Sequence, residues 1–132
     1  MALAKSFRES KTYQHALEAA ESLFQLTRSF SKSETFSLTD QVLRSSRAVS
    51  ALIAEAWARR RYPAAFAEKL NQALAECMET QAWLDHARLC NYVTEDQHSQ
   101  QDDQWQKIGG MISRMIERTG EFCASSPSAN KL

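Results

Sequence analysis

Apolar residues recur at steps of three and four along almost the whole chain, and this rhythm is the feature that most limits the fold. It runs through four segments, at about residues 6–30, 38–60, 63–90 and 94–122. A period of 3.6 residues places such side chains on one face of a helix. The chain has only 3 Gly and 2 Pro, too few for a turn-rich β architecture. The sequence therefore predicts an all-α protein with four amphipathic helices.

The second and third segments carry the clearest apolar stripes. In the second segment the inward-facing set is Leu38, Val42, Ser45, Val49, Leu52, Ile53, Ala56 and Trp57. In the third segment the corresponding set is Phe66, Leu70, Ala73, Cys77, Thr80, Leu84 and Ala87. The fourth segment begins with turns that are polar all round, so only its second half is predicted to pack deeply.

Local signals mark where the helices begin and end. Two pairs of residues have the spacing of a capping box at a helix start, Ser37 with Asp40 and Thr94 with Gln97. Pro63 suits a first helical turn, and Asn91 suits the left-handed residue that ends a helix. Short connections between successive helices favour antiparallel neighbours. The sequence thus predicts an antiparallel up-down-up-down four-helix bundle, formed by a single domain at 1–123 with a flexible tail at 124–132.

The composition limits the compartment and the partners. Sixteen basic residues balance 16 acidic ones, so any basic surface must be local. The 3 Cys form no C-x-x-C pair, and the first ten residues lack the apolar core of a signal peptide. The longest apolar run is far shorter than the ~20 residues of a membrane span. We expect a soluble protein of the reducing cytoplasm that does not associate with membranes.

A metal site deserves consideration because helical bundles can hold two metal ions. Glu95-x-x-His98 resembles half of a di-iron carboxylate motif, which needs two such pairs and two further glutamates. The chain has one pair, in its most polar helical turns, and we interpret it as a solvated helix start. No metal or other cofactor is therefore expected, and a di-metal enzyme is the weakest of the functional alternatives.

Other reactive side chains also favour structural roles. His15 and His86 are predicted to lie at the surface, and the cysteines at 77, 90 and 123 are predicted to be small core residues. The pair Gly109-Gly110 follows no strand and suits close helix approach or a kink. No nucleophile elbow or phosphate-binding lysine motif is present. The sequence predicts that the protein is not an enzyme.

Polar residues follow the apolar stripe of the second helix along one flank. Gln41, Arg44, Arg47 and Glu55 form this predicted polar seam. One interpretation is a solvated flank in which Glu55 pairs with Arg59 one turn later. The other is a boundary between subunits or between bundle helices, where an arginine satisfies groups that water does not reach. On this second interpretation Arg44 and Glu55 each need a partner on another element, since roughly 16 Å of helix separates them.

A basic cluster ends the second helix at Arg59, Arg60, Arg61 and Tyr62. Residues 38–62 hold five arginines against two acids, whereas residues 95–104 hold four acids and no base. The neutral total therefore hides a polarised molecule. Arginines at a helix C-terminus favour the helix dipole, and beside a tyrosine they can also bind phosphates while the ring stacks on a base. Both roles remain open for this cluster.

With these residues in view, the chain resembles the small four-helix-bundle proteins encoded within intervening sequences of bacterial 23S ribosomal RNA genes. The resemblance rests on "FRESKTYQHALEAAESLFQLTRSF", "FSLTDQ", "QVLRSSRAVSALIAEAW" and "LDHARLCNYV". It implies a ring-shaped homo-oligomer, often a pentamer, without an established enzymatic activity. A distant branch serves diversity-generating retroelements by binding a reverse transcriptase and nucleic acid. Leu43 and Leu52 depart from the arginine and asparagine common in that family, which moves the seam toward hydrophobic packing.

The sequence therefore predicts a non-enzymatic scaffold that assembles with itself. The expected partners are further copies of the chain, and RNA or a nucleic-acid-binding protein. Trp57 and Trp83 are predicted to be exposed on a single bundle and covered by assembly. The alternative is a protein-binding adaptor without RNA affinity.

Overall fold

The protein is described by a computed structural model that covers residues 5–123. Within these residues every regular element is helical, which confirms the all-α prediction. The elements are η1 (Phe7–Glu9), α1 (Lys11–Thr27), η2 (Lys32–Glu34), α2 (Leu38–Ala58), α3 (Pro63–Leu89), α4 (Glu95–Glu117) and α5 (Thr119–Cys123). The tail predicted at 124–132 lies outside the described residues.

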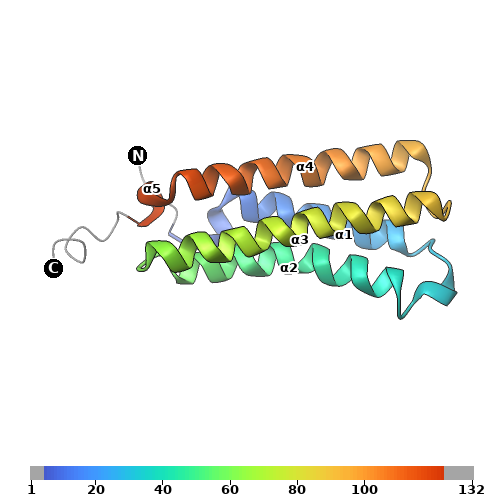
Figure 1. The fold of residues 1–132 in the computed structure, drawn as a ribbon, viewed down its shortest axis with the longest axis horizontal. Helices are drawn as coiled ribbons and strands as arrows, with labels where there is room; N and C mark the ends of the chain where they lie inside the picture. The colour runs from blue at the N-terminus through green and yellow to red at the C-terminus, as the bar shows by residue number, and fades with distance from the viewer. Residues whose placement is uncertain (1–4, 124–132) are drawn as a thin grey trace.

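Four long helices lie side by side along one axis (Figure 1). The chain runs in one direction through α1 and α3 and in the other through α2 and α4. Helices that follow each other in sequence are neighbours in space, and α1 also contacts α4. The α2–α3 turn therefore lies at the same end as α5, while the α1–α2 and α3–α4 connections lie at the opposite end (Figure 1).

Several predicted helix boundaries are confirmed. The Thr94 hydroxyl accepts from the backbone N–H of Gln97 over 3.1 Å, and the Gln97 side chain accepts from the Thr94 N–H over 2.9 Å. This reciprocal pair is the predicted capping box of α4. Pro63 occupies the first turn of α3, and Asn91 adopts a φ of 61° just beyond its end.

The start of α2 is capped by a different residue from the one predicted. Ser37 makes no side-chain cap hydrogen bond. Instead Glu34 Oε1 accepts from the backbone N–H of Leu38 over 3.3 Å and from the Ser37 hydroxyl. Glu34 reaches this position because it ends η2, and its carbonyl accepts from the Ser37 N–H over 3.0 Å in the turn before the helix. The capping box of Ser37 and Asp40 was therefore wrong, and a carboxylate upstream of the helix takes its place.

Two predicted helices are shorter or interrupted. The first begins at Lys11 rather than residue 6, because Ser10 is extended and its hydroxyl accepts from the N–H of Tyr13 over 3.3 Å. The fourth stops at Glu117, because Arg118 leaves helical geometry before α5 begins. The short α5 still packs on the bundle, where the ring of Phe122 stacks on Phe66 with 5.6 Å between centroids.

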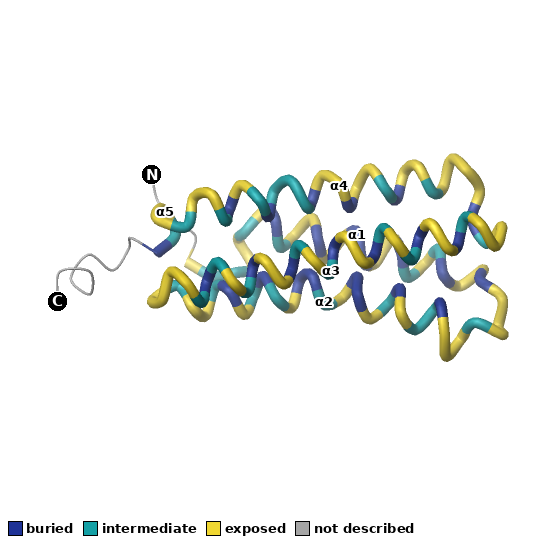
Figure 2. Tube along the Cα trace, in the orientation of Figure 1, coloured by how far each residue is buried: buried dark blue, intermediate teal, exposed yellow. Residues whose placement is uncertain are grey.

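The core lies between the four long helices, and the buried positions face inward (Figure 2). All seven residues predicted for the stripe of α3 are buried. Of the α2 stripe, Leu52 and Trp57 are only half-buried, and the other six residues are buried. The expectation that only the second half of α4 packs deeply was wrong for Gln101, which is 7% exposed and donates from Nε2 to the Ser22 hydroxyl over 3.0 Å.

Candidate interaction surfaces

The predicted polar seam lies on the outer flanks of α2. Gln41, Arg44, Arg47 and Glu55 are all exposed in the single chain. The seam residues do not occupy one line, because Arg47 faces α1 whereas Glu55 faces α3. Arg47 places its guanidinium 5.2 Å from the centroid of the Phe24 ring.

The charged seam residues have partners of their own. Glu55 Oε1 lies 3.1 Å from Lys69 Nζ on α3, and Lys69 is 25% exposed. Among residues 5–123 no ion pair joins Glu55 to Arg59. Arg44 Nη1 lies 3.9 Å from Asp40 Oδ2 on its own helix, and its side chain is 75% exposed. The positive charge of Arg44 also opposes the rise in the pKa of Glu76 on α3, a rise caused chiefly by burial.

The polar groups that α2 does bury are hydroxyls. The Thr80 hydroxyl of α3 donates to the Ser45 hydroxyl over 2.9 Å, and Ser45 in turn donates to the carbonyl of Val42 over 3.3 Å. Ser46 and Ser50 donate to carbonyls of their own helix over 3.2 Å each. Such local bonds satisfy a small polar side chain inside a packed interface. Small side chains also allow close packing of α2 on α3, the most extensive helix contact in the molecule.

The basic cluster divides into two roles. Arg60 lies over the Trp57 ring at 3.7 Å from its centroid, and its Nε donates to the Trp57 carbonyl over 3.0 Å. Arg60 therefore caps the C-terminus of α2 and covers half-buried Trp57. Arg59 and Arg61 are exposed and make no ion pair within residues 5–123. Their guanidinium groups remain available to a ligand.

Further basic residues lie at the same end of the bundle. Arg8 belongs to η1, and Arg118 lies at the junction of α4 with α5. Tyr62 lies at the same end, in the turn between α2 and α3, and is 60% exposed. Arg118 has an acidic partner, since its Nε lies 3.7 Å from Glu121 Oε2. The first turn of α4, with Glu95 and Asp96, lies at the opposite end. The structure thus separates the basic cluster from these acids along the bundle axis.

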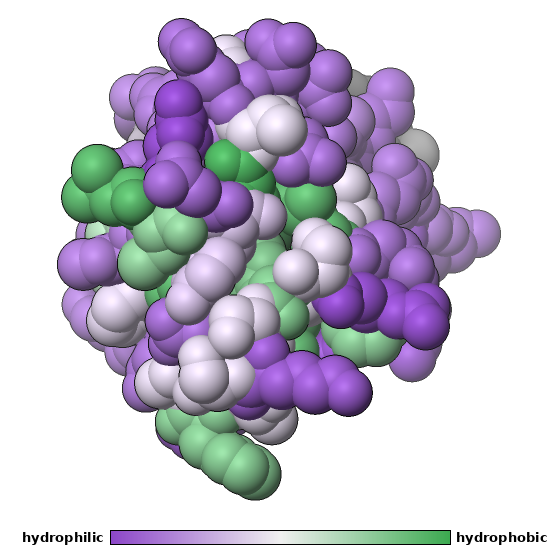
Figure 3. Space-filling view, turned by 90° about the vertical axis from the view of Figure 1, so that its right-hand side faces the viewer, coloured by the Kyte–Doolittle hydropathy of each residue, from purple (hydrophilic) through white to green (hydrophobic). Residues whose placement is uncertain are grey.

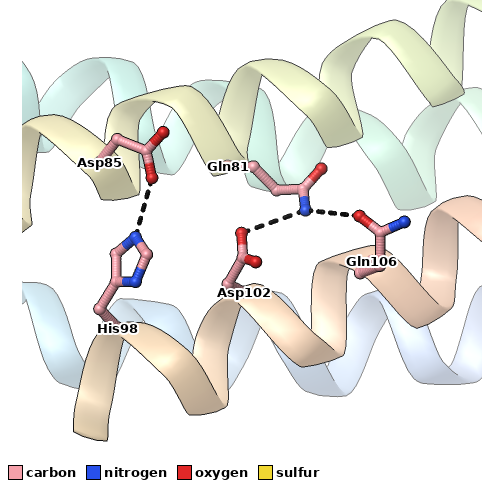
Figure 4. A network of polar contacts seen from close by, with 5 residues as sticks. All are labelled: Gln81, Asp85, His98, Asp102 and Gln106. Atoms are coloured by element: carbon pink, nitrogen blue, oxygen red, sulfur yellow. Dashed lines mark hydrogen bonds and ion pairs between the residues drawn. The ribbon is translucent and has the colours of Figure 1, made fainter. Parts of the chain in front are cut away.

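Polar side chains also join α3 to α4 (Figure 4). His98 Nε2 lies 2.8 Å from Asp85 Oδ1, and Gln81 Nε2 donates over 3.1 Å both to Asp102 Oδ1 and to Gln106 Oε1. The half-motif residue His98 therefore faces a carboxylate of α3. Across the described residues no three His, Cys, Asp or Glu side chains gather closely enough to hold a metal ion.

The cysteines differ in environment. Cys77 is buried, and its thiol donates to the Trp105 carbonyl over 3.0 Å. Burial raises the pKa of the Cys77 thiol to about 12, against a hydrogen bond with the Gly109 backbone that lowers it. Cys123 is also buried, and burial raises its pKa while the nearby Arg60 charge lowers it. Cys90 is exposed, so its prediction as a core residue was wrong. Sequence reasoning placed Cys90 at the end of the third stripe, where the helix has already ended.

Exposed apolar residues were only partly predicted. Trp57 and Trp83 are half-buried rather than exposed. Within residues 5–123 the exposed large hydrophobic side chains are Leu17, Phe36, Tyr62, Met78 and Leu89, with Phe36 94% exposed. Sequence reasoning missed Phe36 because it lies in an irregular connection, where no periodicity indicates direction. His15 and His86 are exposed, as predicted. No helix within residues 5–123 has the length and apolar character that crossing a membrane requires.

Comparison with known proteins identifies the family. The crystal structure of a protein of unknown function from the S23 ribosomal protein family of Bacteroides thetaiotaomicron is similar, with a TM-score of 0.73 and 28% sequence identity. The match covers 80% of this chain and 95% of that one. No curated protein matches the chain. The family model described as the 23S rRNA-intervening sequence protein matches residues 8–114. The chain therefore belongs to the 23S rRNA-intervening sequence protein family, as the resemblance predicted.

Proposed function

We propose that the chain is a non-enzymatic cytoplasmic scaffold that assembles into a ring-shaped homo-oligomer, a pentamer, and binds nucleic acid at the basic end of α2. The observation that carries the proposal is the exposure of Arg59 and Arg61 beside Tyr62 without a carboxylate partner in residues 5–123. A guanidinium fork binds phosphate oxygens in two parallel hydrogen bonds, and an exposed ring can stack on an unpaired base.

Assembly would strengthen a contact that is weak in one copy. Two arginines supply little affinity alone, whereas a ring repeats them around its axis and binds several phosphates of one strand at once. The exposed apolar side chains of Met78 and Leu89 support self-association, since they are in contact with water on the single bundle. Sequence readout is not part of the proposal, because phosphate contacts are the same for every sequence.

The second candidate is a protein-binding adaptor without RNA affinity. The exposed apolar side chains that support self-association would serve a protein partner equally well, and the arginines could contact its acidic side chains. Salt-sensitive binding to RNA separates the two functions, because the adaptor lacks it.

The test is charge reversal at the two exposed arginines. Arg59→Glu combined with Arg61→Glu should weaken binding of a labelled single-stranded RNA at least tenfold. The slope of log affinity against log salt concentration should become shallower by about one to two. Arg60 stays unchanged, because it caps α2. The matched control combines Arg28→Glu with Lys107→Glu, which reverses two exposed charges away from the cluster.

Fluorescence anisotropy over a range of salt concentrations provides the affinity, and sedimentation provides the mass. The proposal requires wild-type binding to weaken with salt and the control to behave as wild type. Equal loss in both double variants would indicate a general charge effect rather than this cluster. Wild-type protein that does not bind RNA at low salt would favour the protein-binding adaptor function.

A further inference from the structure

Phe36 is an exposed aromatic side chain on a well-braced connection. It is 94% exposed, yet the residues on either side are held in place. The Thr35 hydroxyl donates to the Lys32 carbonyl over 2.8 Å, and the Ser37 N–H donates to the Glu34 carbonyl over 3.0 Å. Glu34 also accepts from the hydroxyl of Tyr92 over 2.9 Å, which ties this connection to the one between α3 and α4. The ring is therefore presented to solvent from a fixed backbone.

A pocket opens on the same end of the bundle, between the start of α2 and the end of α3. Its volume is about 240 Å³, and its walls combine Leu38, Trp83, His86 and Cys90 with the polar residues Glu34, Ser37 and Gln41. We call it the Trp83 pocket. The Trp83 Nε1 donates to Glu79 Oε2 over 3.3 Å, and the Trp83 ring lies 5.5 Å from the His86 ring between centroids.

The size and walls of the Trp83 pocket suit a phenyl ring. A dry cavity of about 150 Å³ is enough to hold benzene in a protein interior. Aromatic rings pack favourably edge to face or offset on the faces of other aromatic rings, which Trp83 and His86 supply. Phe36 of the same chain does not fill the pocket, since its ring is almost wholly in solvent.

The same end thus carries both a projecting ring and a pocket that fits one. Figure 3 looks onto this end and shows hydrophobic side chains between polar ones, some of them at its rim. Two copies of a surface that bears both parts can satisfy each other, either reciprocally or head to tail around a ring.

The charges around the two parts are complementary. Lys32 lies close to Phe36 in sequence, is exposed and makes no ion pair within residues 5–123. Glu79 borders the pocket through its bond to Trp83 and likewise has no basic partner in the described chain. Glu34 at the pocket mouth is already satisfied, and its hydrogen bonds from Ser37 and Tyr92 lower its pKa. Docking of a second copy at this pocket would therefore bring a lysine and a carboxylate that each lack an ion-pair partner in the described chain to the same interface.

We infer that Phe36 of one copy inserts its ring into the Trp83 pocket of a second copy. This inference rests on the proposed self-association and names the contact through which it occurs. A central aromatic residue that fills a pocket is the usual dominant contributor to an interface.

The test uses two variants that each remove one half of the contact. Phe36→Ala removes the ring, and Cys90→Trp fills the pocket with an indole; both positions are exposed, so the bundle should stay folded. Each variant alone should associate at least tenfold more weakly than wild type in sedimentation velocity. An equimolar mixture should form one-to-one complexes, because the ring of the Cys90→Trp chain still fits the empty pocket of the Phe36→Ala chain. Leu17→Ala, which trims an exposed apolar side chain of α1, is the control and should associate as wild type.

The outcomes separate the two proposals. Wild-type protein that stays monomeric at all concentrations would overturn the proposed self-assembly and this contact with it. Wild-type protein that associates, with Phe36→Ala equally associated, would overturn the contact alone. Loss of association in both variants without recovery in the mixture would also overturn it, since each chain retains one intact half. Circular dichroism of every variant is the control for intact helices.

Discussion

Glu34 links the connection between α1 and α2 to the connection between α3 and α4. Its carboxylate accepts hydrogen bonds from the Leu38 backbone, the Ser37 hydroxyl and the Tyr92 hydroxyl. One side chain thereby caps α2 and links two connections that are distant in sequence. These hydrogen bonds favour the charged form, so the pKa of Glu34 lies below its ordinary value of 4.5, with the bond from Ser37 as the largest cause.

The lowered pKa of Glu34 makes the stability depend on pH in a defined direction. A carboxyl whose pKa falls on folding stabilises the native state above its unfolded pKa, and this contribution is lost as pH falls through the folded value. Unfolding by denaturant, followed from neutral pH to below 4.5, should therefore show a loss of stability on the acidic side that Glu34→Gln reduces. Tyr92→Phe is the control, because it removes one of the three bonds and should have a smaller effect. Identical acid profiles for Glu34→Gln and wild type would contradict the prediction.

Glu55 gives a second prediction at this scale. Its ion pair with Lys69 is more than half exposed on the Glu55 side, so solvent screens it. Glu55→Ala should lower the free energy of unfolding by less than about 1 kcal/mol in a single bundle. Denaturant midpoints measured at low and high protein concentration check this value, with Lys69→Ala as the reciprocal variant. A larger loss that grows with concentration would indicate that Glu55 lies in a subunit boundary, the other interpretation of the polar seam.

The sequence predicted the local contacts of such residues better than their contacts with other helices. The spacing of Thr94 and Gln97 is a local pattern, and local geometry was enough to form the capping box. The cap at Ser37 failed because a competing carboxylate, Glu34, reaches the same backbone N–H through the fold of η2. The seam was predicted along one flank of α2, whereas Arg47 faces α1 and Glu55 faces α3. The partner of Glu55 comes from α3, and no spacing within α2 could reveal it.

At the scale of the elements, α4 contains two adjacent glycines that its own packing does not require. A Cβ added at Gly109 would lie 3.5 Å from Leu74 Cδ1 and 3.8 Å from Cys77 Sγ, which is ordinary contact. A Cβ at Gly110 would lie 3.6 Å from Arg114 Nη1, the end of a flexible side chain. The expected close approach of α3 to these glycines is therefore not a steric necessity.

Alanine at either glycine should stabilise the bundle. Glycine inside a helix costs roughly 0.5–1 kcal/mol relative to alanine, because the unfolded chain loses more freedom on folding. Gly109→Ala and Gly110→Ala should each raise the free energy of unfolding by about that amount in denaturant titrations of dilute protein. A marked loss of stability in either variant would show that the local backbone or a neighbour does not tolerate the methyl group.

Periodicity predicted the inward face of α3 completely and that of α4 only in part. The stripe of α3 is continuous, so every turn repeats the same direction. Gln101 is buried in α4 because its amide meets Ser22 of α1, and hydropathy alone gives a glutamine no inward signal. The interruption at Arg118 was equally hidden, since the apolar rhythm continues through it into α5.

For the whole molecule, the reaction rates of the three cysteine thiols should differ with their burial. In dilute native protein we expect a thiol reagent to modify Cys90 at least about tenfold faster than the other two, because thiolate formation and access both favour an exposed thiol. Cys77, with a pKa of about 12, should react only when the bundle unfolds. Cys123 should react at an intermediate rate through detachment of α5. Mass spectrometry of timed samples with Cys90→Ser as control provides the order, and early modification of Cys77 would contradict it.

The all-α class followed from the sequence because helix periodicity is a property of each segment by itself. The end-to-end separation of the Arg59–Arg61 cluster from the acids of α4 was also foreseeable once neighbouring helices run in opposite directions. The Trp83 pocket was not, because it forms between the start of one helix and the end of the next. Such surfaces depend on how far each helix extends, and sequence patterns locate helix ends least well.

The unequal contacts between helices have a consequence for how the chain reaches this structure. The α2–α3 interface is the most extensive, and its helices are joined by the four residues 59–62, so their association requires little loop closure. The contact between α1 and α4 is smaller, is bordered by hollows of about 260 and 340 Å³, and joins segments from opposite ends of the domain. We expect the central hairpin to form early and α1 to close last onto α4. During synthesis α1 emerges first and can pack on α2, but the part of its apolar face that contacts α4 stays in water until the last long helix has left the ribosome.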